Sequence, residues 1–221
     1  MTRLIIYDFD GVIADSEVVA NTVLAEFVTE LGTPTTLEDS YRLYMGKRFN
    51  EVVAAVEASL GRSLPESFPA EFQQRTLERF RNELRLVDGA RQYVDAFAHL
   101  PRCIASSSSP DRLAVCLDVL GLQSDFGGRV FSASAVSRGK PHPDIFLHAA
   151  EQMQCKPADC IVIEDSPSGV AAGVAAGMTV IGLMAASHMR PEHRARLASA
   201  GARFVASTFE EAAHITRRLL A

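Results

Sequence analysis

The chain opens with a short apolar run that ends abruptly in two carboxylates. Leu4-Ile5-Ile6-Tyr7 leads into Asp8, Phe9 and Asp10, with Gly11 directly behind. An apolar run of this length, bounded by polar residues and glycine, predicts a buried β-strand. Side chains two positions apart on an extended backbone project to the same side, so we expect Asp8 and Asp10 to reach one site together. Taken alone, the pair also fits an acidic turn that ends a strand.

Residues 16–87 show helical periodicity and no strand-like segment. Apolar residues recur every three or four positions in three stretches, and Gly32 and Gly61 end the first two. The pattern predicts an α-helical domain, residues 16–87, inserted after the first strand. The periodic positions are Val18, Val19, Thr22, Val23, Phe27 and Leu31, then Val52, Val53, Val56 and Leu60, then Phe72, Leu77, Phe80 and Leu84.

From Val87 onward, short apolar runs alternate with segments long enough to be helices. This alternation predicts parallel strands joined by helices, and therefore an α/β fold with a doubly wound parallel sheet. Residues 1–15 and 88–221 would form this core domain. The predicted strands are Cys103–Ala105, Arg129–Phe131, Cys160–Glu164, Thr179–Leu183 and Arg203–Val205.

Composition narrows the class of protein. The 221 residues are 48% hydrophobic and 22% charged, which is an ordinary globular balance, and the net charge of −5 includes no block of like charge. A nucleic-acid partner is not expected, because such proteins carry a basic surface. No apolar run is long enough for a membrane span. The four cysteines lack CxxC spacing and predict buried thiols in a reducing compartment, so we expect a cytoplasmic location. The sequence gives no indication of oligomeric state.

A serine-rich turn follows the strand that ends near Ala105. Ser109 before Pro110 has the pattern of a helix N-cap with proline at the first helical position. Ser106 and Ser107 would then lie between a strand end and a helix N-terminus, where hydroxyl and N–H groups suit an anion. A polar turn without a ligand is the alternative. No GxSxG pattern marks these serines as nucleophiles.

Two further segments carry charge at predicted loops and strand ends. Lys140 lies in Gly139-Lys140-Pro141-His142-Pro143, where a lysine is often only a solvated charge. Glu164 and Asp165 end an apolar strand, as Asp8 and Asp10 do. If the two strand ends are neighbours, the four carboxylates crowd one volume and require a cation. Oxygen ligands and an anionic substrate favour Mg²⁺.

These four segments, in this order, resemble the four motifs of the haloacid dehalogenase superfamily. The helical insertion after the first motif is similar to that of the β-phosphoglucomutase-like branch, which has a small helical cap. The resemblance implies a phosphoryl-transfer enzyme in which Asp8 attacks phosphorus and Asp10 acts as acid and base. It implies that Ser106, Ser107 and Lys140 bind the phosphoryl oxygens. It also implies that Asp8, the Asp10 main-chain carbonyl and Asp165 hold Mg²⁺, with Glu164 supporting.

The resemblance leaves three functions open. Asp10 indicates phosphate-ester chemistry, because the dehalogenases of the superfamily lack aspartate there. We expect a Mg²⁺-dependent phosphatase of a small phosphorylated metabolite, such as a sugar or sugar-acid phosphate like 6-phosphogluconate. A phosphoglucomutase is the first alternative, although the cap histidine of those enzymes is absent near Val19–Asn21. A phosphometabolite-binding regulator without turnover is the second.

The insertion contains one candidate substrate-binding loop. Gly46, Lys47 and Arg48 lie between two predicted helices, and the glycine would permit a tight turn. The two cations could bind the non-reacting part of an anionic substrate. They could equally be solvated charges that precede the next helix.

Overall fold

The computed structural model describes residues 3–45, 47 and 49–221. The chain separates into two compact units, Met1–Asp15 with Arg85–Ala221 and the inserted Ser16–Leu84. The second boundary lies three residues before the one expected from the sequence. Hydrogen bonds give the reason, because Asp15 N–H donates to Arg85 O over 2.9 Å and Val87 N–H donates to Ile13 O over 3.0 Å. Both bonds fasten residues 85–87 to the larger unit.

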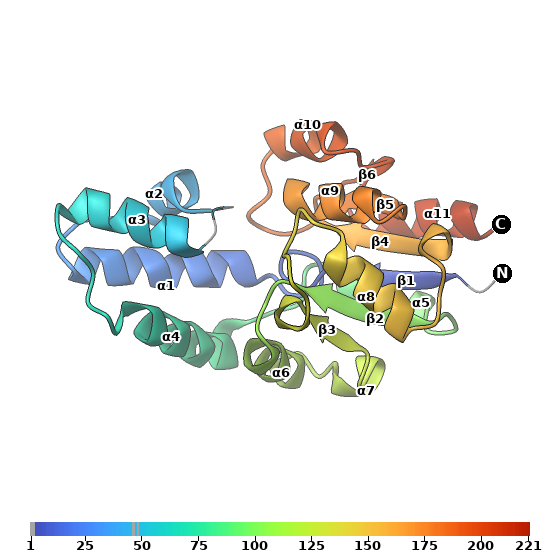
Figure 1. Ribbon diagram of the computed structural model, residues 1–221, viewed down its shortest axis with the longest axis horizontal. Helices are drawn as coiled ribbons and strands as arrows, with labels where there is room; N and C mark the ends of the chain where they lie inside the picture. Colours follow the sequence, from blue (N-terminus) through green and yellow to red (C-terminus); the bar gives the residue numbers. More distant parts are fainter. Residues whose placement is uncertain (1–2, 46, 48) are drawn as a thin grey trace. The chain divides into compact units, whose positions relative to one another are not determined.

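The larger unit contains a six-stranded sheet whose paired strands are all parallel, in the order β3-β2-β1-β4-β5-β6 (Figure 1). This confirms the predicted doubly wound α/β fold. Tyr7 in β1 pairs with Ile104 in β2 and with Ile163 in β4, so these three strands end at one edge. The strands are β1 Leu4–Tyr7, β2 Arg102–Ser106, β3 Val130–Ser132, β4 Cys160–Glu164, β5 Thr179–Leu183 and β6 Phe204–Ala206.

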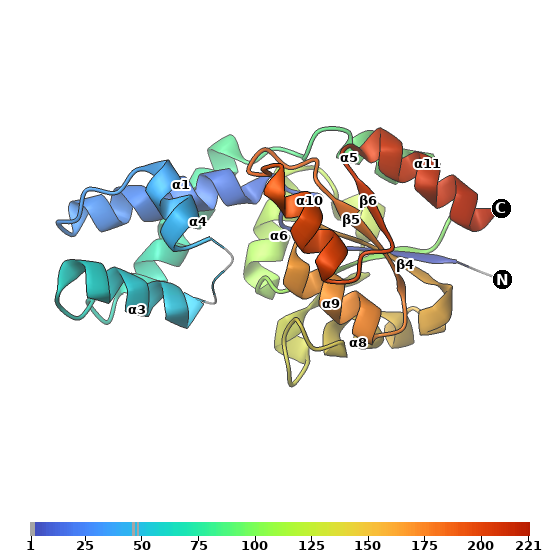
Figure 2. The same ribbon diagram turned by 90° about the horizontal axis from the view of Figure 1, so that it is seen from above.

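Helices cover both faces of this sheet (Figure 2). On one face, α8 (Asp144–Gln152), α9 (Pro167–Ala175) and α10 (Glu192–Ser199) pack against the strands. On the other face lie α5 (Ala90–Ala96) and α11 (Phe209–Leu220). The remaining elements of this unit are α6 (Pro110–Val119), α7 (Gln123–Phe126) and the short 3₁₀ turns η1 (Ala133–Ala135) and η2 (Pro157–Asp159).

The alternation of strand side chains builds two buried layers. Ile6 joins Cys103, Val162 and Phe146 in the core beneath α8 and α9. Tyr7 points the opposite way and meets Tyr93 edge-on, with ring centroids 5.9 Å apart. All four cysteines are free, and all but the half-buried Cys155 are buried. Burying strands on both faces explains why the sequence shows continuous apolar runs instead of alternation.

In its described residues, the regular secondary structure of the inserted unit is all α-helical. It consists of α1 (Ser16–Glu30), α2 (Leu37–Leu43), α3 (Phe49–Leu60) and α4 (Phe68–Glu83). Phe27, Val56 and Phe68 belong to its own apolar core. The helix α2 was not predicted, although Thr36 and Asp39 form a reciprocal capping box that begins it. Among the described helices, none combines the length and apolar character needed to span a bilayer.

Candidate active site

The predicted first motif forms a tight turn at the end of β1. Asp8 N–H still donates to Ile163 O on β4 over 3.0 Å, but the strand has ended at Tyr7. The chain then folds back, since the N–H groups of Ile13 and Ala14 both donate to Phe9 O over 2.9 Å. The carboxylates of Asp8 and Asp10 have different hydrogen-bond partners, Lys140 for Asp8 and Arg112 for Asp10.

Three carboxylates meet at the shared edge of β1 and β4. One oxygen from each of Asp8, Glu164 and Asp165 lies within 4.8 Å of the other two, and all three residues are buried. Lys140 joins them from the loop before α8. Its Nζ donates to Asp8 Oδ1 over 2.7 Å and to Glu164 Oε1 over 2.8 Å. Residues far apart in the sequence therefore form one cluster of opposite charges.

Burial and neighbouring charges shift the pKa values of Asp8 and Lys140. Burial raises the pKa of Asp8 to about 7, against the lowering effect of Lys140, while the neighbouring Glu164 raises it further. Burial alone would lower the pKa of Lys140, but Asp8 and Glu164 outweigh it and hold that pKa above its usual value. The lysine is therefore an ammonium near neutral pH, and Asp8 is readily ionised once another cation approaches.

Glu164 links the cluster to the start of α9. Its second oxygen, Oε2, accepts hydrogen bonds from Ser166 N–H over 2.6 Å and from Ser166 Oγ over 3.0 Å. Ser166 in turn caps α9 at Gly169 N–H. A Cβ at Gly169 would overlap the Glu164 carboxylate, so only glycine permits this approach. Both Glu164 oxygens are thus engaged, one with Lys140 and one with the helix start.

Asp10 turns its carboxylate toward a different set of partners. Arg112 Nη2 donates to Asp10 Oδ1 over 2.6 Å, and Ser108 Oγ donates to Asp10 Oδ2 over 2.6 Å. The Asp10 side chain does not belong to the three-carboxylate cluster. Its expected role in metal binding concerned the main-chain carbonyl and stays a prediction. Neither Arg112 nor Ser108 was singled out from the sequence, although Arg112 lies in the first turn of the helix that Ser109 was predicted to cap.

The serine turn after β2 has the predicted local structure. Ser109 accepts a hydrogen bond from Arg112 N–H over 3.4 Å as the N-cap of α6, with Pro110 at the first helical position. Ser106 is buried and its Oγ accepts from Ser108 N–H over 3.0 Å, whereas Ser107 is exposed. Ser106 ends β2 beside β1, so this turn lies at the same sheet edge as the acidic cluster. Phosphate binding by Ser106 and Ser107 stays a prediction.

Comparison with known proteins identifies the family. The family described as haloacid dehalogenase-like hydrolase matches residues 2–177 of this chain. The chain belongs to the haloacid dehalogenase-like hydrolases. The predicted family is thereby confirmed.

Individual relatives cover nearly the whole length of this family member. The 6-phosphogluconate phosphatase of Escherichia coli K12 is 27% identical over 194 residues, covering 86% of this chain and 87% of that protein. A haloacid dehalogenase-like protein from Agrobacterium tumefaciens superposes with a TM-score of 0.89 at 34% identity, covering all of both chains. A haloacid dehalogenase family hydrolase from Deinococcus radiodurans, solved with bound phosphate and sodium, gives 0.84 at 32% identity over 99% and 97%. This haloacid dehalogenase-like hydrolase is a phosphatase, as predicted.

The acidic cluster of this hydrolase fits a divalent cation. If ionised, Asp8, Glu164 and Asp165 leave an excess of two negative charges over the single ammonium of Lys140. Buried like charges at this spacing repel one another unless a cation compensates them. Carboxylate oxygens are the ligands that Mg²⁺ prefers. Asp8 and Asp165 suit that role best, since Glu164 already holds Lys140 and Ser166.

A buried histidine that the sequence did not single out packs against the cluster. His188, in the loop after β5, is 5% exposed, and its Nε2 lies 3.6 Å from Asp165 Oδ2. Burial lowers the pKa of His188 to about 4, against the opposing attraction of Asp15. The ring is therefore neutral near neutral pH. A Cβ at Gly11, which has φ +75°, would overlap the Asp165 carboxylate and come close to His188.

The predicted cap residues are only partly described. Gly46 and Arg48 lie outside the described residues. Lys47 is exposed, and its main-chain N–H donates to Tyr44 O over 3.2 Å within the inserted unit. Binding of substrate by Gly46, Lys47 and Arg48 stays a prediction from the sequence.

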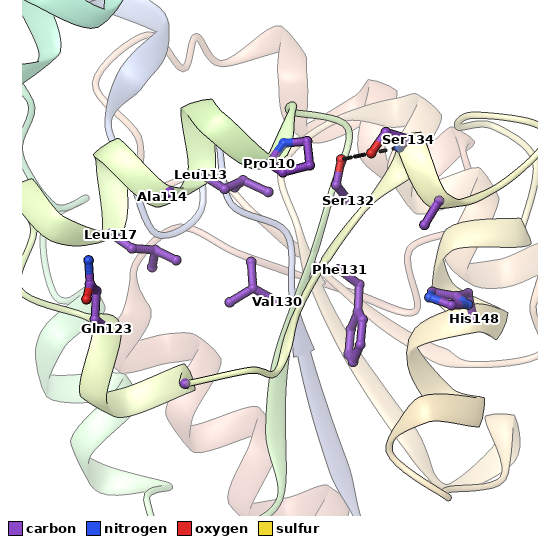
Figure 3. A pocket seen from close by; sticks show the side chains of 12 residues that line it. Pro110, Leu113, Ala114, Leu117, Gln123, Val130, Phe131, Ser132, Ser134 and His148 are labelled. Carbon is purple, nitrogen blue, oxygen red and sulfur yellow. Dashed lines mark hydrogen bonds between the residues drawn. The ribbon is translucent and has the colours of Figure 1, made fainter.

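A separate cavity of about 550 Å³ lies at the edge strand β3 (Figure 3). Leu113 and Leu117 of α6 line one side, Val130 and Phe131 form its floor, and His148 of α8 lines the other side. None of the three clustered carboxylates lines it. The cavity is therefore distinct from the candidate active site.

Proposed function

We propose that this phosphatase hydrolyses a small phosphorylated metabolite, of the sugar or sugar-acid phosphate class, through an aspartyl-phosphate on Asp8 with Mg²⁺ bound. The observation that carries the proposal is the placement of Asp8 against Lys140 and Asp165 at a shared strand edge. Such an edge is where open α/β sheets bind their ligands. The serine turn at the start of α6 supplies N–H and hydroxyl groups for an anion at the same edge.

In the first step, an Asp8 oxygen attacks phosphorus while the bond from phosphorus to the substrate oxygen breaks. Asp10 donates a proton to the departing oxygen, so the alcohol leaves neutral. Lys140 keeps the Asp8 carboxylate in place, and with Ser106 and Ser107 it offsets the charge that develops on the phosphoryl oxygens.

In the second step, water attacks the phosphorus of the aspartyl-phosphate. Asp10, now ionised, takes a proton from that water, and the bond between Asp8 and phosphorus breaks. The products are inorganic phosphate and the regenerated Asp8 carboxylate. The Asp10 carboxyl group thus acts as acid and then as base, which requires this group to stand beside Asp8 without being bound to the cation itself.

Asp8, Asp165 and the Asp10 main-chain carbonyl would hold the metal, with Glu164 supporting. When bound, Mg²⁺ supplies positive charge that lets a phosphate dianion approach three carboxylates. The raised pKa of Asp8 supports this assignment, because the buried carboxylate lacks enough compensating charge from Lys140 alone.

The substrate class rests on the relatives. One is a 6-phosphogluconate phosphatase, and a solved family hydrolase contains bound phosphate. The presence of Asp10 supports hydrolysis of an alkyl ester, whose leaving oxygen needs a proton. A phosphoglucomutase would carry its cap histidine near Val19–Asn21. In this chain Asn21 instead accepts a hydrogen bond from the buried Ser40 over 2.8 Å, which gives this position a structural role and disfavours a mutase. A cytoplasmic location remains a prediction.

The test is release of inorganic phosphate by the purified protein from a panel of phosphorylated metabolites, including 6-phosphogluconate, in Mg²⁺ and in EDTA. Asp8→Asn keeps the size of the side chain but removes the attacking charge, so turnover should fall by several orders of magnitude. Rapid quenching with borohydride followed by peptide mass analysis should mark Asp8 in the wild type only.

Asp118→Asn is the matched control, because Asp118 is an exposed aspartate on α6 whose carboxylate contacts only Gln123 in the described hydrogen-bond network. Its activity should equal that of the wild type. Near-normal turnover by Asp8→Asn would exclude the aspartyl-phosphate. No phosphate release from any compound would instead favour a binding protein, and transfer between two positions of one sugar would favour a mutase.

A further inference from the structure

The apolar cavity at the edge strand β3 has no part in the proposed chemistry. Its volume of about 550 Å³ lies in the range of small-molecule sites. Leu113 and Leu117 of α6 and Val130 and Phe131 of β3 give it apolar walls (Figure 3). In the described part of the chain, β3 pairs with β2 alone, so no further strand covers this side of the sheet. A cavity of this kind offers an apolar molecule a place out of water.

An aromatic pair joins the floor of the cavity to its far side. The rings of Phe131 and His148 lie edge to face, with centroids 5.6 Å apart and planes at 88°. Two fixed rings favour a flat aromatic ligand, which can stack on one and meet the other edge-on. The described residues that line the cavity include no Asp, Glu, Lys or Arg. A charged molecule would therefore lose water there without compensation, and the lining favours an uncharged one.

Two serines give one end of the cavity a hydrogen-bond acceptor. Ser134 Oγ donates to Ser132 Oγ over 3.0 Å, and Ser132 Oγ donates to Ser108 O over 2.6 Å. A serine hydroxyl has one proton and two lone pairs, so Ser134 Oγ has its proton engaged and its lone pairs left to accept. A ligand that suits this end carries an O–H or N–H group.

Contacts outside the cavity hold its walls in place. Pro110, which lines the cavity, is the first residue of α6, and this helix is capped by Ser109 Oγ accepting from Arg112 N–H over 3.4 Å. The bond from Ser132 to Ser108 fixes the end of β3 against the turn that follows β2. Because the walls are built before a ligand arrives, binding costs little ordering of the protein.

We propose that this cavity binds a small, uncharged aromatic molecule that carries one O–H or N–H donor. Its ring would lie between the α6 leucines and the pair of Phe131 and His148, with its donor on Ser134 Oγ. The proposal does not rest on the phosphatase mechanism, since none of the three clustered carboxylates lines the cavity. A strand from a second copy of this chain is the less suitable occupant, because β3 offers it only the three residues Val130–Ser132 for pairing.

The experiment uses 2-naphthol as the probe and its methyl ether, 2-methoxynaphthalene, as the matched compound without a donor. Protein is added to a fixed, dilute probe, and the fluorescence anisotropy of the probe reports binding. The wild type should bind 2-naphthol with a dissociation constant below about 1 mM. Ser134→Ala should weaken 2-naphthol binding by about three- to tenfold and leave binding of the methyl ether within about twofold, because only the first compound loses a hydrogen bond.

A second variant fills the cavity. Ala114 lines the cavity but is exposed on α6, so the fold should tolerate a larger side chain at this position. Ala114→Trp should weaken binding of both probes by at least about tenfold. Ala195→Trp is the matched control, because Ala195 is an exposed alanine on α10 and does not line the cavity. It should bind both probes as the wild type does. If Ala114→Trp does not fold, Ala135→Trp takes its place, at another exposed alanine of the lining.

Wild-type protein that does not bind 2-naphthol, or a folded Ala114→Trp that binds it unchanged, would overturn the site. Equal effects of Ser134→Ala on both probes would overturn the assignment of the donor. Analytical ultracentrifugation tests the other occupant, and a dimer that Ala114→Trp converts to a monomer would show that a second copy covers the cavity and would overturn the proposal. All of these outcomes leave the proposed phosphatase activity as it stands.

Discussion

Lys140 Nζ lies 2.7 Å from Asp8 Oδ1, with both side chains less than 10% exposed. This pair joins a loop before α8 to the end of β1, and Glu164 Oε1 completes it at 2.8 Å from the same ammonium. Buried charges so placed depend on one another, since removing one leaves the others without compensation.

Lys140→Met should be inactive and less stable in the absence of metal. Removing the ammonium leaves Asp8 and Glu164 buried without their shared partner, which costs on the order of 3 kcal/mol in the free energy of unfolding. Urea denaturation in EDTA at pH 7.5 measures this loss. Lys156→Met, at an exposed lysine, should behave as the wild type. Unchanged stability of Lys140→Met would mean that the cluster is neutral in the folded protein.

Substitutions at two glycines that share the same φ angle distinguish backbone strain from steric overlap with a neighbouring side chain. Gly11 and Gly177 both have φ +75°, but only at Gly11 would a Cβ overlap the Asp165 carboxylate. Gly177→Ala should therefore cost about 1–2 kcal/mol of stability and leave activity intact. Gly11→Ala should in addition weaken Mg²⁺ binding by at least about tenfold, because the displaced carboxylate is a proposed ligand. Calorimetric titration with Mg²⁺ measures the difference, and equal Mg²⁺ affinity in the two variants would contradict it.

His188 should make the folded protein sensitive to acid. Its pKa is about 4 in the folded protein and near 6.5 in an unfolded chain, so the unfolded state binds more protons between these values. The part of the free energy of unfolding that depends on His188 is therefore fully present above pH 6.5. It is lost as the pH falls toward 4, by at most about 3 kcal/mol. His188→Gln should lack this component. Denaturation of both proteins in EDTA from pH 7 to 4.5 measures it, and parallel profiles would show that His188 does not contribute.

Metal removal should affect stability as well as activity. EDTA should abolish phosphate release and Mg²⁺ should restore it, and Mg²⁺ alone should raise the unfolding temperature because it binds only the folded acidic cluster. Ca²⁺ should bind but support little turnover, since it takes a looser, higher coordination. Asp165→Asn should lose the thermal shift while Asp118→Asn keeps it. Full activity in excess EDTA would exclude a metal requirement.

The succession of elements along the chain, and the bounds of some of them, could be predicted from local patterns. β4 and β5 have the predicted bounds, and α6 begins at the Ser109-Pro110 cap. Apolar runs, caps and glycine stops act over a few residues, so the sequence displays them directly. The parallel order then brings Asp8, Ser106 and Glu164 to one edge, because adjacent parallel strands end together.

Only the tertiary structure decided where the side chains beyond the strand ends point. Asp10 and Arg112 are 102 positions apart, and Asp165 and His188 meet from loops after different strands. Nothing in the sequence indicated that Arg112 and Ser108 would hold the Asp10 carboxylate. Local periodicity sets the elements and their order. The contacts of a side chain in a turn depend on backbone angles and on partners from distant segments, which no local pattern records.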